Sequence, residues 1–216
     1  MILIFFVELL ILFFLSRLTS RELSKLFYKI LRSQKISIFL ISIIFLPGTI
    51  VHELSHAIMA KILFVHVGKI ELTPSLDGDS LKLGSVQVGQ SDVFRNFFIG
   101  IAPFLSGTAI LVSILYFTFS NNIYGLNLFT GGIIYFIFVI ANTMYSSGKD
   151  MEGAIEFFAI ILIPIIIFYF LGIKIDTKFM TSLLPFIFIQ QAVFLMMIPI
   201  FGNIAIIVFA KILNRS

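Results

Sequence analysis

The chain contains no cysteine and no tryptophan, and it has few charged residues. Without cysteine it forms no disulfide and has no thiolate to bind a metal ion. Without tryptophan, an aromatic belt at a membrane surface has to come from the six tyrosines and some of the 27 phenylalanines. Charged residues make up only 12% of the 216 positions and hydrophobic residues make up 59%. Because soluble domains carry about 25% charged residues, the composition and a mean hydropathy of +1.11 predict an integral membrane protein.

Long apolar runs predict an all-α polytopic membrane protein with about six transmembrane helices. The expected spans are 1–16, 36–63, 93–119, 128–145, 154–171 and a sixth within 180–213. The second span contains Pro47-Gly48, and the third is interrupted by GIAPFLSG at 100–107. Such breaks are tolerated where protein or water, and not lipid, satisfies the backbone. Three regions follow from this pattern, namely 1–35, a membrane core at 36–153 and additional spans at 154–216.

A basic segment follows the first apolar run. Residues 17–35 hold six lysines and arginines and one glutamate. The positive-inside rule favours a cytoplasmic juxtamembrane segment here, and the pattern also fits an amphipathic helix on the membrane surface. The segment is not expected to bind nucleic acid, because the rest of the chain is lipid-soluble.

The most polar part of the chain, residues 64–90, predicts a small β-hairpin. VHVGKIELTP and LKLGSVQVG show partial alternation of apolar and polar residues, which is typical of strands. SLDGDS between them contains the Asp-Gly pair that favours a tight turn. His66 at the start of this region is interpreted as a surface histidine.

The stretch VHELSHAIMA places an HExxH motif inside the second apolar run. On a helix, His52 and His56 lie one turn apart on the same face, so that both imidazoles can bind one Zn²⁺. Glu53 is offset by about 100° around the helix axis, where it can take a proton from a metal-activated water. A polar cluster that packs helices together is the alternative interpretation. It has to explain three ionisable side chains within a span, which is costly unless they have partners.

A catalytic zinc site needs a third protein ligand, and Asp150 is the preferred candidate. It follows an apolar helix and several small polar residues, Asn142, Thr143, Ser146 and Ser147. A helix that ends in such residues can line a wet cavity at membrane depth. Glu152 and Glu156 are the nearby alternatives.

These residues resemble the site-2 protease family of intramembrane zinc metalloproteases. That family combines HExxH on one span with a motif of the type Asn-x-x-Pro-x-Pro-x-x-Asp-Gly on another. Asn142 and Asp150 have the spacing of the Asn and Asp in that motif. Tyr145, Ser147 and Met151 stand where the two prolines and the glycine are expected, so the resemblance is to a divergent member. It covers residues 36–153 and includes the hairpin and the interrupted span.

The resemblance implies a zinc metalloendopeptidase that cleaves membrane-associated or transmembrane proteins or peptides within the bilayer. One Zn²⁺ per chain is expected, held by His52, His56 and Asp150, with Glu53 as the catalytic acid and base. Asn142 is expected to bind the substrate backbone or the oxyanion, although a helix–helix hydrogen bond is equally compatible. The expected location is a multi-pass protein of the cell membrane. Three points stay open, namely the orientation of the site, the oligomeric state, and whether the chain is instead a catalytically silent relative or a metal transporter.

Overall fold

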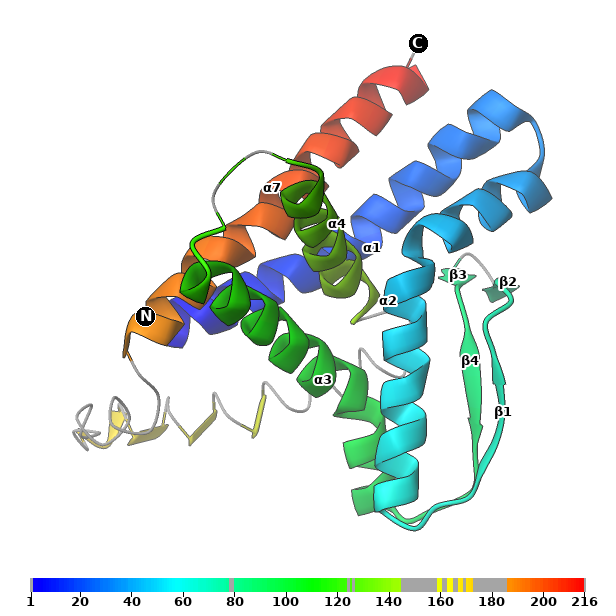
Figure 1. The fold of residues 1–216 in the computed structure, drawn as a ribbon. Coiled ribbons are helices and arrows are strands. Elements are labelled where there is room, and N and C mark those ends of the chain that lie inside the picture. Colours follow the sequence, from blue (N-terminus) through cyan, green and yellow to red (C-terminus); the bar gives the residue numbers. More distant parts are fainter. Residues whose placement is uncertain are drawn as a thin grey trace.

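The computed structural model describes residues 2–77, 80–123, 125, 127–144, 159–160, 163–164, 167–168, 170–172 and 186–215. This part of the chain is built mainly from long helices, with one short hairpin packed against them (Figure 1). The long helices are α1 (Ile2–Leu31), α2 (Gln34–Ile62), α3 (Val93–Ser120), α4 (Leu128–Thr143) and α7 (Phe186–Arg215).

The first apolar run and the basic segment belong to a single helix, α1. Neither glycine nor proline occurs between Met1 and Leu46, and arginine and lysine are good helix formers, so nothing stops the helix at Arg17. It ends at Leu31, where Arg32 takes a positive φ of 53° and Ser33 caps the start of α2. The predicted basic surface helix is therefore the second half of α1.

α2 bends in its middle (Figure 1), and it contains Pro47 in its central part. Proline has no N–H to donate to the carbonyl four residues earlier, so that the hydrogen-bond ladder opens there. The carbonyl that lacks this donor belongs to Ile43. The next carbonyl, that of Ile44, accepts a hydrogen bond of 2.7 Å from the hydroxyl of Tyr135 on α4. The helix continues beyond the bend and carries the HExxH motif on its second half.

α3 differs from the interrupted span that was predicted. It runs as one helix from Val93 to Ser120, with Pro103 inside it. Within this helix, the hydroxyl of Ser106 lies 3.3 Å from the carbonyl oxygen of Pro103 and can donate a hydrogen bond to it. GIAPFLSG is consequently a helical stretch, and its small residues matter for packing.

α1 and α7 lie side by side and run in the same direction (Figure 1). Buried Thr19 donates a hydrogen bond of 2.7 Å to the side chain of buried Asn203. Further along, Lys29 donates to the carbonyl of Leu213 at 2.8 Å. Two hydrogen bonds at successive levels therefore hold α1 and α7 together, although these helices are far apart in the sequence.

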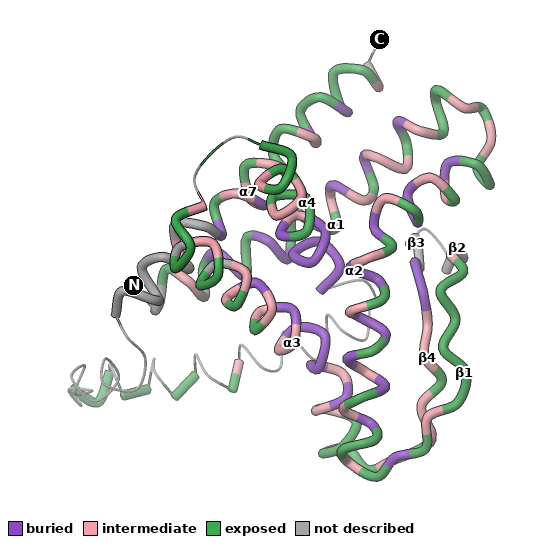
Figure 2. Tube along the Cα trace, in the orientation of Figure 1, coloured by how far each residue is buried: buried purple, intermediate pink, exposed green. Residues whose placement is uncertain are grey.

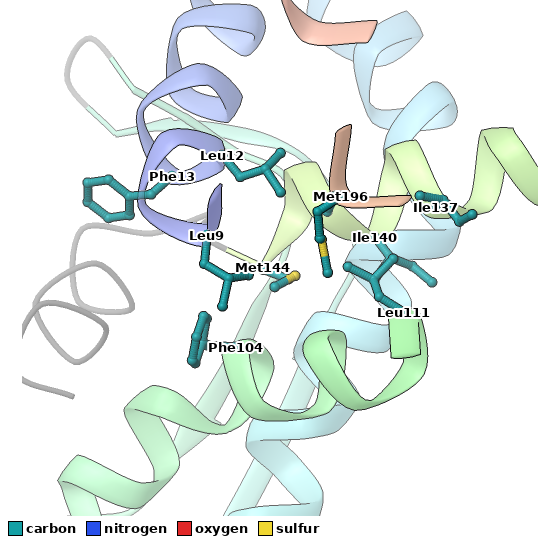
Figure 3. Packing of buried hydrophobic residues seen from close by; sticks show 10 residues of the cluster. Leu9, Leu12, Phe13, Phe104, Leu111, Ile137, Ile140, Met144 and Met196 are labelled. Atoms are coloured by element: carbon teal, nitrogen blue, oxygen red, sulfur yellow. The ribbon is translucent and has the colours of Figure 1, made fainter. Parts of the chain in front are cut away.

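The main hydrophobic core lies where α1, α3, α4 and α7 meet (Figure 3). Its fully or nearly fully buried members are Leu9, Leu12, Phe13, Phe104, Leu111, Ile137, Ile140, Ala141, Met144 and Met196. Glu8 is also buried, with 5% of its surface exposed, so this carboxyl does not face lipid.

The predicted hairpin is confirmed. β1 (Val67–Glu71) pairs antiparallel with β4 (Ser85–Val88), and Ile70 lies opposite Val86. Nearer the turn, β2 (Ser75–Asp77) pairs with β3 (Ser80–Lys82). β4 packs against α2, which brings the returning strand to the motif helix.

Three helices within the described residues are long and apolar enough to cross a membrane, at Gln34–Ile62, Val93–Thr118 and Met196–Asn214. The shorter helix at Leu128–Thr143 is also apolar. The chain is therefore compatible with a membrane protein that is mostly helical, and the count of six spans stays a prediction.

Candidate metal centre

The two motif histidines face each other across one turn of α2. Their Nε2 atoms are 3.2 Å apart, and the ring centroids are 4.9 Å apart. Two nitrogen ligands of a tetrahedral zinc ion, each about 2.0–2.1 Å from the metal, lie about 3.3 Å from each other. The spacing of His52 and His56 therefore fits a shared zinc ion, as the sequence predicts.

A backbone carbonyl on α3 sets the tautomer of His56. The Nδ1 atom of His56 lies 2.7 Å from the carbonyl oxygen of Ile99. Because a carbonyl oxygen only accepts, Nδ1 carries the proton and donates it, and in the neutral ring the lone pair is on Nε2. Metal-binding histidines are commonly oriented in this way by a hydrogen bond from the other ring nitrogen. Ile99 thus holds His56 in the form that a metal ligand needs.

His52 is buried and borders a small space between α2, α3 and α4, called the His52 cavity below, which is too narrow to hold a water molecule. The side of α2 that faces this cavity and the C-terminal end of α4 are both largely buried (Figure 2). The lining residues are Gly48, Val51, His52, Pro103, Gly107, Ile140, Thr143 and Met144. The end of α4 therefore lies beside the first metal-ligand candidate.

Glycines allow the end of α4 to come this close. A Cβ atom on Gly48 would lie 2.8 Å from Val139 Cγ1 and 2.9 Å from Thr143 Cγ2, and one on Gly107 would lie 2.9 Å from the sulfur of Met144. These distances are shorter than normal carbon contacts, so a side chain at either position would push α4 away. The close packing of small residues is common between membrane helices.

Replacing Gly48 by alanine is expected to lower the stability of the protein by about 1–3 kcal/mol, because the β-branched side chains of Val139 and Thr143 cannot move aside easily. The matched control is Gly131→Ala in α4, where an added Cβ meets nothing within 4 Å. Thermal unfolding in detergent measures both variants. Equal midpoints for the two would contradict the proposed close crossing of α2 and α4.

Glu53 lies on another side of α2, against the hairpin. Its side chain is 3% exposed, and a Cβ added to Gly84 would lie 3.0 Å from Glu53 Oε1. The neighbouring Leu83 is buried in a cluster with Ile41, Phe45 and Val139. Leu83 therefore anchors the returning strand, and Gly84 lets its backbone approach the carboxylate. The sequence alone does not point to Gly84 or Ile99, and it marks Gly48 only as part of a break in a span, because only the long-range packing gives these residues their roles.

A second polar contact joins α2 to α3 within the motif region. Ser55, inside HExxH, is hydrogen-bonded to Ser106, and it also donates to the carbonyl of Val51 at 2.6 Å. This contact and the His56–Ile99 bond join the same two helices, α2 and α3. The motif serine therefore has a structural role in this arrangement.

The other predicted site residues have different outcomes. Asn142 is buried and donates a hydrogen bond of 2.8 Å to the carbonyl of Phe138 within α4, and its neighbour Thr143 lines the His52 cavity instead. Asp150 lies outside the described residues, as do Glu152 and Glu156. His66 is exposed on the hairpin side, as predicted.

Where the structure describes the chain, no group of three or more histidine, cysteine, aspartate or glutamate side chains is arranged to hold a metal ion. The two histidines fit such an ion, and a third ligand has to come from elsewhere. Comparison with protein-family models, with curated protein sequences and with solved structures gave no match to this chain.

Proposed function

We propose that this protein is a membrane-embedded zinc metallopeptidase that hydrolyses peptide bonds of membrane-associated or transmembrane substrates. The supporting observation is the histidine pair, with Nε2 atoms 3.2 Å apart and His56 oriented by the Ile99 carbonyl. Glu53, one residue after His52 and buried beside it on the same helix, completes the HExxH chemistry.

His52, His56 and Asp150 would hold the zinc ion. Asp150 is six residues beyond Met144, which lines the cavity with His52. Six residues span up to about 20 Å of extended chain, so the segment that follows α4 is long enough to return to the histidines. When bound, zinc polarises the peptide carbonyl and makes a water molecule reactive near neutral pH.

Glu53 would move the proton in this reaction. One of its carboxylate oxygens accepts a proton from the attacking water while the water oxygen bonds to the peptide carbon. As the C–N bond breaks, the same carboxyl group gives that proton to the leaving nitrogen. The close approach of Gly84 limits the positions open to the carboxylate during both transfers.

Zinc content tests the metal assignment directly. The purified protein is expected to contain about one zinc ion per chain by elemental analysis, and His52→Ala together with His56→Ala is expected to remove it. His66→Ala is the matched control, because this histidine is exposed on the hairpin side and is expected to leave the zinc in place. Zinc that persists in the double variant, or that is lost with His66, would contradict the assignment.

A further inference from the structure

The second half of α1 carries a row of cations on one side. Arg17, Arg21, Lys25 and Lys29 follow each other at four-residue spacing, and all four are exposed. At about 100° per residue they fall within an arc of about 120° around the helix. This row is called the basic face below.

Little negative charge offsets the basic face. Glu22 is the only acidic residue between positions 9 and 52 of the sequence. It is 6% exposed, accepts a bond of 2.9 Å from Lys25 and is contacted by Asn214 of α7. Lys211 of α7 adds another exposed cation close to Glu22. The outward electrostatic character is therefore positive.

Apolar side chains are exposed at the same level of the molecule. Leu23 and Phe27 of α1 pack against Ile41 and Phe45 of α2, which fixes the relative heights of the two helices. The outward side chains of α2 at this height are Phe39, Ile43 and Leu46. The Thr19–Asn203 and Lys29–Leu213 hydrogen bonds fix the height of α7 relative to α1. The exposed apolar side chains of α7 at this height are Ile204, Val208, Phe209 and Ile212. Exposed cationic and exposed apolar side chains therefore lie at the same level of the molecule.

We propose that the basic face binds the headgroups of anionic phospholipids, whose acyl chains lie along the exposed apolar side chains of α2 and α7. A soluble polyanion would match the charge of the basic face but would leave the exposed apolar side chains of α2 and α7 in water. An anionic phospholipid matches the cations with its headgroup and the apolar side chains with its acyl chains. Arginine and lysine reach the phosphate level while their aliphatic stems stay in apolar surroundings. This lipid site uses none of the proposed catalytic residues and stands independently of the proposed function.

Native mass spectrometry of the full chain in neutral detergent tests the site. Phosphatidylglycerol is expected to be retained in preference to phosphatidylcholine with the same acyl chains, and the preference is expected to fall as ionic strength rises. Arg32, directly after the end of α1, is a further exposed cation next to the basic face. The triple variant Arg17→Gln, Arg21→Gln, Arg32→Gln is expected to bind phosphatidylglycerol at least about tenfold more weakly, with phosphatidylcholine unchanged. Lys25 and Lys29 are kept, because they bond to Glu22 and to the Leu213 carbonyl.

The matched control removes three cations elsewhere, through Lys61→Gln, Lys69→Gln and Arg95→Gln, and is expected to keep the lipid preference. Equal retention of the two lipids by the wild type would overturn the proposal, as would equal losses in both triple variants. If soluble polyglutamate bound as tightly as phosphatidylglycerol, the face would belong to an acidic protein segment, and the lipid site would be wrong. The salt dependence of the wild type supplies a test even if the triple variant fails to fold.

Discussion

Glu53→Gln is expected to reduce peptide hydrolysis on the order of 10³-fold while the protein keeps its zinc. Glutamine has nearly the same shape, so it fits the space beside Gly84 and Thr49 and leaves the two histidines undisturbed. Its amide cannot take up the proton of an attacking water. The variant therefore separates proton transfer from metal binding and from folding.

A quenched fluorescent transmembrane peptide in proteoliposomes gives the rate, and elemental analysis gives the zinc content of the same samples. Glu71→Gln is the matched control, because it makes the same change at an exposed carboxylate on β1. Activity that survives Glu53→Gln would refute the role of this residue. A wild-type protein that binds zinc and cleaves no substrate would identify a catalytically silent relative.

Asp150→Ala is expected to weaken zinc binding by at least about 100-fold and to abolish hydrolysis with it. The loss of a direct ligand should exceed the 10–100-fold effects found for groups that only orient a ligand. Competition with a chelator measures the affinity, and the hydrolysis assay follows in parallel.

The nearby acids provide the controls for Asp150. Glu152→Gln and Glu156→Gln remove carboxylates two and six residues farther along and are expected to retain zinc. If one of them loses the metal while Asp150→Ala keeps it, the third ligand has been assigned to the wrong acid. If all three retain zinc, the ligand set has to be completed by another part of the chain.

Local patterns were sufficient to predict the motif helix and the hairpin. The one-turn spacing of His52 and His56 is a property of any α-helix, and the alternation in 64–90 is a property of strands. The structure confirms the facing imidazoles and the antiparallel strands. In both cases the residues that determine the geometry are neighbours in the sequence.

Contacts between distant segments could not be predicted in this way. Gly84 gives no local signal, and Gly48 and Gly107 indicate only breaks in their spans. The importance of all three glycines lies in the side chains that they meet from other elements. Asn142 illustrates a related limit, because motif spacing selects it while the helix face that borders the cavity belongs to Thr143, about 100° away. The continuity of α1 and α3 also depends on whether their residues favour or interrupt helical backbone. Hydropathy alone does not report this property.

The pairing of α1 with α7 has a consequence for the order of events during biosynthesis. Thr19 and Asn203 are 184 residues apart, and Glu22 and Asn214 are 192 residues apart. While the ribosome is still making the middle of the chain, α7 has not been synthesised. Thr19 and Glu22 of α1 therefore lack their hydrogen-bond partners on α7 during this time. Such long-range contacts form late and slow the final assembly. The nascent protein thus reaches its complete arrangement only after α7 has left the ribosome.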